Sequence, residues 1–375
     1  MRQLIDAPWI FIEQYRDKES PAEAGFSDYI WQALFACQID VRSHQEWVKL
    51  KWGFNASALF DETLERQRLF LESQYVNQND LGAENPDHLT LAFRYINRPG
   101  EGLLVTALGK IHAQTEADAM EGAMAFYREI KSIFPYDYTL VPALSRDEFL
   151  QLSGWDVLDN RDERLDLAQI RRLEVPIYRK IPAIQGLWQS SPRAHEQIWR
   201  TLAASPYPVL LNTSIRCTLL YEKERQSLLK SMQEISDLPD DLLNSKTLSA
   251  LKLWNSSYTE RRLSLWKKFF YLQVHLASTR KIDEHLFRIT GTSLALGKEN
   301  NSLPGYQVIS PKSNEVDAWR KKLMNLDFVF SKSYLPIPRF SEVADMDEVF
   351  SVVRLPYLPP ENGFPDMNFV SAKSQ

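Results

Sequence analysis

The chain has 375 residues, of which 44% are apolar and 25% are charged. This composition is typical of globular proteins and excludes an intrinsically disordered chain, and the length predicts two or three domains. The formal net charge of -5 excludes a general electrostatic attraction to nucleic acid or to an anionic membrane.

Residues 1–44 are predicted to form an N-terminal helical segment. Its first part contains an apolar patch but also Asp6 and Asp17, and it has no small-residue cleavage site of a signal peptide. No window of the sequence approaches the ~20 apolar residues that a membrane-spanning helix needs. The two cysteines, Cys37 and Cys217, fit no metal-binding spacing and suit a reducing compartment. We therefore expect a cytoplasmic protein without membrane contact.

Residues 45–144 are predicted to form a first compact unit. The spacing of apolar residues indicates strands at 47–54, 89–95, 103–111 and 138–141, and helices at 59–75 and 115–134. The residues Asn97–Gly102 between the middle strands include the proline and glycines that are typical of a turn. Thr115, followed by Asp118 three positions later, indicates the start of a helix. The resulting β-α-β-β-α-β order is that of ferredoxin-like folds.

An acidic, weakly periodic linker is expected at 145–168, and the same order of elements is predicted to return over 169–330. The pattern indicates strands at 209–217, 286–295, 306–309 and 327–330, a long helical insertion at about 220–281, and a helix that opens at Ser310-Pro311. The predicted fold class is therefore α+β, with two ferredoxin-like units of which the second carries the insertion.

Residues 331–375 differ from the rest because they are rich in proline, at positions Pro336, Pro338, Pro356, Pro359, Pro360 and Pro365. Such segments are usually extended and often lie across a neighbouring surface. We therefore predict an extended C-terminal tail.

Motifs of common enzyme and cofactor sites are missing from the sequence. Neither Gly109-Lys110 nor Gly297-Lys298 has the upstream glycine and the Ser/Thr of a P-loop, and GxGxxG, HExxH and GxSxG are absent. The six histidines are scattered without metal-ligand spacing. We predict no catalytic, cofactor-binding or metal-binding residue and a protein that is not an enzyme, an unrecognised active site being the weakest alternative.

One basic and aromatic stretch, residues 261–281, is predicted to be helical. No acidic residue lies between its six cations, and four aromatic residues are interleaved with them. These cations could follow a phosphate backbone, which makes them candidate nucleic-acid-binding residues: Arg261, Arg262, Lys267, Lys268, Arg280 and Lys281. The pattern also fits a helix with aromatic residues in the core and solvated cations, and we prefer that simpler interpretation.

Three blocks of the sequence carry a family resemblance. Leu103–Pro142, Glu174–Leu228 and Val349–Phe364 resemble, in layout and scattered residues, the N-terminal half of bacterial HerA/FtsK-superfamily ATP-binding proteins, relatives of conjugation-type ATPases. In that family an Arg-Leu-Pro segment like that of the third block directly precedes the motor domain. Here the sequence reaches Gln375 without Walker motifs, so no catalytic residue of the family can be transferred to it.

The resemblance implies a non-catalytic accessory subunit. We expect it to assemble, in several copies, with a separately encoded HerA/FtsK-type ATPase that forms a hexameric ring, in a DNA-processing, transfer or anti-phage defence complex. Arg354, Leu355 and Pro356 are the expected partner-binding residues because they lie at the position where a motor would begin. The alternative function is a nucleic-acid-binding module that contacts DNA through residues 261–281.

Overall fold

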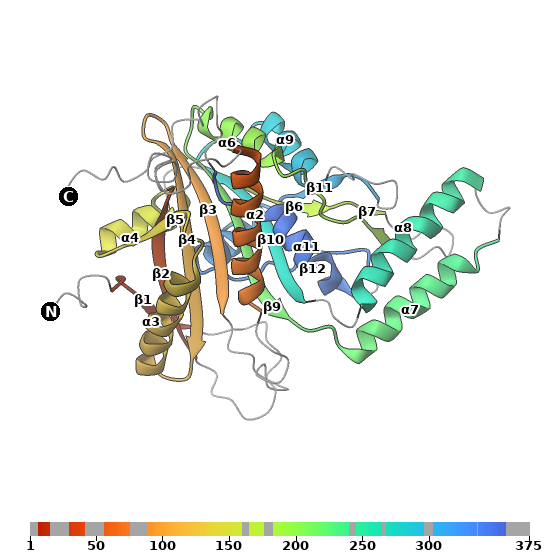
Figure 1. The fold of residues 1–375 in the computed structure, drawn as a ribbon, viewed down its shortest axis with the longest axis horizontal. Coiled ribbons are helices and arrows are strands. Elements are labelled where there is room, and N and C mark those ends of the chain that lie inside the picture. Colours follow the sequence, from red (N-terminus) through yellow and green to blue (C-terminus); the bar gives the residue numbers. More distant parts are fainter. Residues whose placement is uncertain are drawn as a thin grey trace.

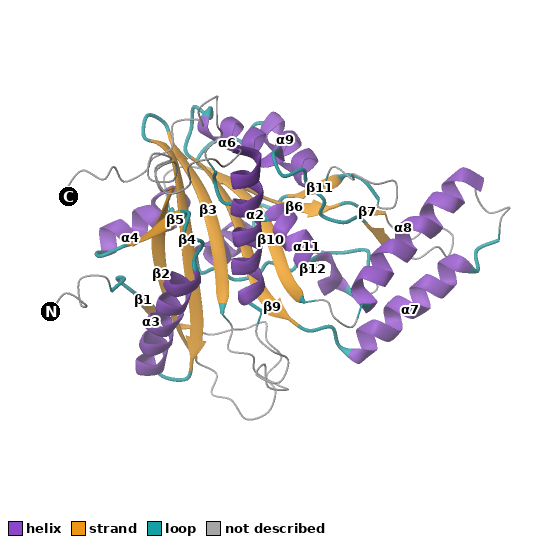
Figure 2. Cartoon of the chain, in the orientation of Figure 1, coloured by secondary structure: helices purple, strands orange, loops and turns teal. Residues whose placement is uncertain are grey.

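The computed structural model describes residues 7–15, 30–41, 56–75, 89–159, 165–175, 183–239, 245–264, 268–295, 303–335 and 337–357. These residues combine helices with a large, antiparallel sheet (Figures 1 and 2). The predicted α+β class is therefore confirmed.

Ten strands of the described chain form one sheet whose main path is β1-β2-β4-β3-β9-β10-β6-β11, while β5 also pairs with β2 and β12 with β10. Their bounds in that path are β1 (Phe11–Tyr15), β2 (Ile30–Val41), β4 (Gly102–Ala113), β3 (Thr90–Arg98), β9 (Val209–Thr218), β10 (Phe269–Ser278), β6 (Asp166–Arg172) and β11 (Tyr306–Ile309), with β5 (Tyr138–Pro142) and β12 (Val343–Asp345) beside it. The short strands β7 (Glu174–Val175) and β8 (Ile184–Gln185) pair separately. The antiparallel pairing of β3 with β9 joins the two halves of the chain into one continuous sheet.

Helices cover both faces of this sheet. The larger apolar core lies under α2 (Ala56–Ser73), α3 (Glu116–Ile133), α6 (Ala194–Ala203), α9 (Glu284–Leu294) and α11 (Met346–Val352). A second core lies on the opposite face, under α4 (Arg146–Ser153), α5 (Trp155–Leu158) and α10 (Val316–Met324). The long helices α7 (Glu222–Ser236) and α8 (Ser245–Leu263) lie side by side and project from the sheet as an arm, at the right of Figure 1.

The local signals in the first unit act as the sequence predicts. The Thr115 side chain accepts a hydrogen bond from the Asp118 amide at 3.1 Å and caps α3. Gly100 and Gly102 have φ values of 88° and 82°, which a glycine adopts without steric cost, and they turn β3 into β4. The two middle strands and both helices of the unit are confirmed within a few residues of their predicted bounds.

The N-terminal helical prediction for residues 1–44 is wrong in the described part, because β1 and β2 lie there. The side chains of Ala33–Cys37 are almost fully buried, since β2 packs against a core on each face of the sheet. A strand buried on both faces loses its alternation and cannot be told from a helix by periodicity. The strand predicted at 47–54 lies outside the described residues.

The linker predicted at 145–168 is also wrong, since α4, α5 and the start of β6 lie there. Ser145 caps α4 by accepting a hydrogen bond from the Glu148 amide at 3.2 Å, and Gly154, with φ of 70°, ends it. Phe149 is fully buried in the second core. Two of the acidic residues that suggested a linker, Asp147 and Glu148, lie in the first turn of this capped helix, where negative charge is favourable.

The helical insertion exists as α7 and α8, but it ends at Leu263 rather than near 281. Residues 269–278 form the central strand β10, and 284–294, predicted as a strand, form α9, whose cap is the Asp283 side chain. The predicted last strand at 327–330 is irregular chain. The sequence of β10 does alternate between apolar and polar residues over 272–276, a strand signal that the prediction of one long helix overlooked.

The extended tail is contradicted where the structure describes it. Residues 338–341 form a short 3-10 helix (η1), 343–345 form β12 and 346–352 form α11. Asp345 and Glu348 form a capping box, in which each side chain accepts a hydrogen bond from the other's amide at 3.1 Å. Pro336 and residues beyond 357 lie outside the described residues.

None of the helices that the structure describes is long and apolar enough to cross a membrane.

Candidate functional site

The six candidate nucleic-acid-binding residues do not share a helix. Arg261 and Arg262 lie at the end of α8, Lys268 precedes β10, and the exposed Arg280 and Lys281 follow that strand. Lys267 lies outside the described residues. The predicted helix over 261–281 is therefore wrong, and a ten-residue strand separates its cations.

Arg262 is fully buried and cannot face solvent. Its guanidinium lies 2.6 Å from a carboxylate oxygen of Glu348 and donates a hydrogen bond to the Val343 carbonyl at 2.9 Å. Arg261 forms a two-pronged pair with Asp345 at 2.6 and 2.7 Å. Both arginines therefore bind α11 and β12 inside this chain.

Glu348 is the centre of this group, which we name the Glu348 cluster: Arg172, Arg261, Arg262, Asp345 and Glu348. One oxygen of Glu348 accepts hydrogen bonds from Arg172 at 2.6 Å and from the Trp188 amide at 3.1 Å, while the other faces Arg262. Arg172 also donates to three backbone carbonyls at 340, 341 and 343. The cluster thus ties α8 and β6 to the segment of residues 337–357.

The electrostatics of the cluster favour ionised groups. Burial alone would raise the pKa of Glu348, but the guanidinium groups of Arg262 and Arg172 outweigh it and hold the pKa well below its usual range. Burial alone would lower the pKa of Arg262, but the negative charge of Glu348 outweighs this effect and raises the pKa of Arg262. A carboxylate that stays ionised between two guanidinium groups is an anchor rather than a general acid.

A second buried ion group lies beside the first. Arg171 donates to Glu174 and lies 3.3 Å from Glu342, and all three side chains are about 1% exposed. Burial raises the pKa of Glu342 despite the neighbouring Arg171. Ser331 accepts a hydrogen bond from Arg171 at 2.8 Å, so this group fixes the chain that leads into η1.

The predicted partner-binding residues Arg354, Leu355 and Pro356 are buried in this structure. The Gln67 side chain on α2 pairs with both backbone groups of Leu355, accepting from its amide at 3.1 Å and donating to its carbonyl at 3.2 Å. The Tyr95 hydroxyl on β3 donates to the Arg354 carbonyl. The three residues therefore hold the 337–357 segment against the sheet and do not form an exposed surface here.

Titratable groups with strongly shifted pKa values surround this segment. Burial, with help from the charge of Arg354, lowers the pKa of His195 to about 3, and burial lowers that of Arg354 to about 9. Burial also raises the pKa of Tyr95 and Tyr138 well above the usual range. Such a concentration is typical of functional sites, and structural cores also produce it.

His275 lies on the opposite face of the sheet, in a polar row. It pairs across strands with Gln169 and Asn212, and Asn212 pairs with Arg94. The imidazole packs edge-on against Trp319 of α10 at a centroid distance of 6.2 Å, and neither ring nitrogen has a hydrogen-bond partner among the described residues. Burial, with a smaller contribution from Arg94, lowers its pKa to about 3, so the ring is neutral near pH 7.

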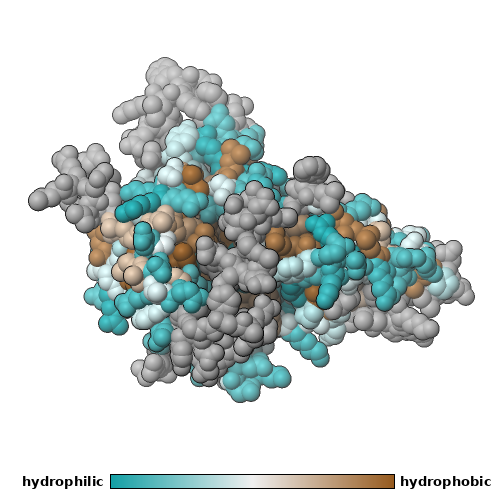
Figure 3. Space-filling model, turned by 90° about the horizontal axis from the view of Figure 1, so that it is seen from below, coloured by the Kyte–Doolittle hydropathy of each residue, from teal (hydrophilic) through white to brown (hydrophobic). Residues whose placement is uncertain are grey.

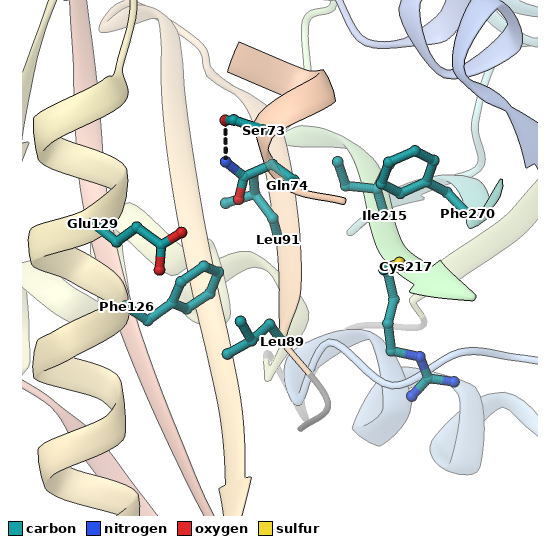
Figure 4. Close-up of a pocket in the computed structure, with 10 residues that line it drawn as sticks. Ser73, Gln74, Leu89, Leu91, Phe126, Glu129, Ile215, Cys217 and Phe270 are labelled. Carbon is teal, nitrogen blue, oxygen red and sulfur yellow. Dashed lines mark hydrogen bonds between the residues drawn. The ribbon is translucent and has the colours of Figure 1, made fainter. Parts of the chain in front are cut away.

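A small hollow opens between α2, α3 and the sheet (Figure 4). Its cavity volume of about 30 Å³ is far below the roughly 300–1,000 Å³ of small-molecule sites. Figure 4 shows the Glu129 carboxylate near the Phe126 ring on one side and Ile215 and Phe270 on the other. The hollow is too small for an organic cofactor.

No three potential ligand side chains come together as a metal site in the described part of the chain. In the view of Figure 3, groups of apolar residues lie between hydrophilic ones. The α7–α8 arm, at the right of that view, is mostly hydrophilic although Leu229 and Leu253 are exposed. The arm by itself therefore identifies no ligand.

The sequence contained a signal for the Glu348 cluster that pattern reasoning missed. Asp345 and Glu348 have the spacing of a capping box, and Arg171-Arg172 are adjacent cations directly after the apolar Ile170. Gln67 and His195 carry no comparable signal, since nothing in the pattern predicts that α2 and α6 enclose residues 353–357.

Comparison with models of known protein families and with curated protein sequences found no match to this chain.

Proposed function

We propose that this chain is a non-catalytic subunit that assembles with a separately encoded P-loop ATPase of the HerA/FtsK type. Its support is the sequence resemblance together with the position of residues 349–357, the part of the resembling Arg-Leu-Pro block that the structure describes. In the family that block leads into the motor domain. The 375 residues contain no P-loop of their own.

The observation that carries this proposal is the way the 337–357 segment is fixed. The Glu348 cluster holds its middle, and Gln67 and Tyr95 hold residues 354 and 355. Val349, Leu355 and Tyr357 add apolar burial to these polar contacts. A partner that binds next to Tyr357 would therefore contact a segment that is fixed to the sheet, to α2 and to α8.

The finer fold assignment, two ferredoxin-like units, belongs to the same proposal. Its support is the strand order β5-β2-β4-β3, with α2 and α3 between strands, and the order β11-β6-β10-β9, with α6 and α9. The first strands of these two sets are β2 and β6, in place of the predicted strands at 47–54 and 209–217. An assembly on a hexameric ring would place several copies of this tandem unit around the motor. DNA processing, DNA transfer and defence are the pathways that such motors serve.

The test is co-expression of the tagged chain with the P-loop ATPase encoded next to it, followed by affinity purification. We expect the ATPase to co-purify with the wild-type chain. Gln67→Ala removes the two bonds to Leu355 and loosens the segment, so we expect a several-fold lower yield of ATPase.

Gln197→Ala is the matched control for this experiment, because Gln197 is an exposed glutamine on another helix, α6. It should leave the ATPase yield unchanged. Recovery of no ATPase with the folded wild-type chain would count against the proposal.

A second candidate function, nucleic-acid binding, has support at another place than residues 261–281. Tyr271, Phe328 and Phe330 form an aromatic cluster in which the Phe330 ring lies 5.5 Å from that of Tyr271 and 6.5 Å from that of Phe328. Tyr221 lies across Arg339 from this cluster, since the Arg339 guanidinium is 4.8 Å from the Tyr221 ring and 5.5 Å from the Tyr271 ring. The Arg216 guanidinium lies 4.8 Å from the Phe328 ring. Phe330 and Tyr221 are 49% and 58% exposed, so bases of a single strand could stack on them.

Single-stranded DNA binding tests this second candidate by fluorescence anisotropy at low salt. If the cluster binds DNA, Phe330→Ala should weaken binding by about tenfold, because one base–aromatic stack contributes about 1–3 kcal/mol. Tyr207→Ala, a similarly exposed aromatic residue outside the cluster, is the control and should bind as the wild type does. Equal binding by both variants, or none by the wild type, excludes the aromatic cluster as a DNA site.

A further inference from the structure

Arg354 is buried without a counter-charge in the described chain, as Arg94 is, but Arg94 donates hydrogen bonds to Asn212 and to the Ser153 and Leu323 carbonyls. Arg354 is only 4% exposed, yet none of the described carboxylates lies within ion-pair distance. Its Nε and Nη1 atoms are enclosed and have no hydrogen-bond partner in the part of the chain that the structure describes. By contrast, Arg171, Arg172 and Arg262 each face a glutamate.

The groups packed around Arg354 do not compensate its charge. Its guanidinium carbon lies 3.5 Å from the centroid of the Phe350 ring, and that of Arg68 lies 5.7 Å from the same ring. The nearby acids are engaged elsewhere: Asp347 pairs with Arg68 at 2.8 Å, and Glu196 accepts a hydrogen bond from the Tyr357 hydroxyl at 2.8 Å. Two guanidinium groups therefore flank one ring.

A buried ring nitrogen of His195 in this region also has no partner in the described chain, and it is an acceptor because a neutral imidazole that donates to a carbonyl through Nε2 carries no proton on Nδ1. The Nε2 atom of His195 lies 3.0 Å from the Val352 carbonyl oxygen, while its Nδ1 atom is buried without a partner among the described residues. The remaining guanidinium nitrogen of Arg354, Nη2, is not among the enclosed atoms and marks the edge that solvent can reach. Unsatisfied buried polar atoms of this kind are costly, and native structures usually pair them with a solvent molecule or an ion.

We propose that Arg354 is the receptor for an external anionic group, a phosphate or a carboxylate, that binds at the Nη2 edge between α2 and α11. Such a group would form charge-assisted hydrogen bonds with the guanidinium and replace the missing counter-charge. The half-exposed Arg68 adds a second positive charge at the entrance. Free phosphate and a carboxylate side chain of a bound protein present the same chemistry, and the site would exist whether or not an ATPase binds the chain.

Thermal unfolding at constant ionic strength tests the proposal, with sodium chloride replaced stepwise by sodium phosphate or, separately, by sodium acetate. We expect the Tm of the wild type to rise by about 2 °C for each tenfold increase in the anion above its Kd. In Arg354→Met, which removes the charge and keeps an apolar stem of similar length, the Tm should not respond. Arg354→Lys retains a charge and should keep part of the response.

Arg320→Met is the control, because Arg320 pairs with the exposed Asp317 on α10, away from this site. Its response to either anion should equal that of the wild type. A larger response to phosphate would assign a phosphate ligand, and a response to acetate at least as large would assign a carboxylate. An equal Tm increase in Arg354→Met and wild type, or none in the wild type with both anions, would overturn the proposal.

Discussion

Glu348→Gln is expected to lower the free energy of unfolding by about 3–5 kcal/mol, because it leaves Arg172 and Arg262 buried without their shared counter-charge. Both guanidinium groups lie 2.6 Å from Glu348 oxygens, and all three side chains are 0% exposed. The amide of glutamine has nearly the same shape, so the loss reports charge rather than volume. Chemical denaturation monitored by circular dichroism measures it.

Asp317→Asn provides the matched comparison. Asp317 pairs with Arg320 at 2.8 Å, but its side chain is 85% exposed. Exposed pairs of this kind contribute about 0–1 kcal/mol, so the variant should unfold almost as the wild type does. Similar losses in both variants would mean that the Glu348 cluster does not anchor the 337–357 segment.

Acidification from pH 7.5 to pH 5 is expected to destabilise the protein by about 4 kcal/mol through His195 and His275 together. Each has a pKa lowered from 6.5 to about 3 in the folded state. Between these values the unfolded chain binds more protons than the folded one, so stability falls as the pH falls. Because pH 5 lies 1.5 units below the unfolded-state pKa of 6.5, protonation of each histidine in the unfolded chain lowers the free energy of unfolding by about 2 kcal/mol.

Denaturant unfolding at pH 7.5, 6.5, 5.5 and 5.0 checks this expectation. His275→Gln should remove about half of the pH-dependent loss, because glutamine does not titrate. His285→Gln changes an exposed histidine on α9 and should keep the wild-type pH dependence. If His275→Gln has the same pH dependence as the wild type, burial does not keep His275 neutral in the folded protein.

The elements that the sequence predicted well carry local signals. The helix α3 has the Thr115 cap and an apolar stripe on one face, and the β3–β4 turn needs the two glycines that the sequence supplies. These features depend on neighbouring residues only. They could therefore be recognised without knowledge of the tertiary structure.

The elements that were predicted wrongly are determined by burial. β2 lies inside the sheet with a core on both faces, so its apolar run Ala33–Cys37 resembles helical sequence. Proline in the 337–357 segment suggested an extended tail, whereas the Asp345–Glu348 capping box and the buried ion pairs specify a short helix. Tertiary contacts outweigh composition in each case.

The surroundings of Arg354 and Leu355 could not be predicted from the sequence. Arg354 and Leu355 were predicted to bind a partner because they belong to a segment that resembles the one before the motor domain in the ATPase family. In the structure both residues are buried. Their neighbours come from α2, β3 and α6, more than 150 residues away in sequence, as the Tyr95 bond to residue 354 and the His195 bond to residue 352 illustrate. No single-sequence pattern encodes such contacts.

Native mass spectrometry of the tagged chain, co-expressed with the neighbouring P-loop ATPase and purified under mild conditions, tests the central proposal most directly. The account predicts masses that correspond to several copies of this chain bound to an ATPase oligomer, and their loss when the ATPase gene is deleted from the expression plasmid. Spectra that contain only the chain itself, in the presence of a folded and oligomeric ATPase, would contradict it.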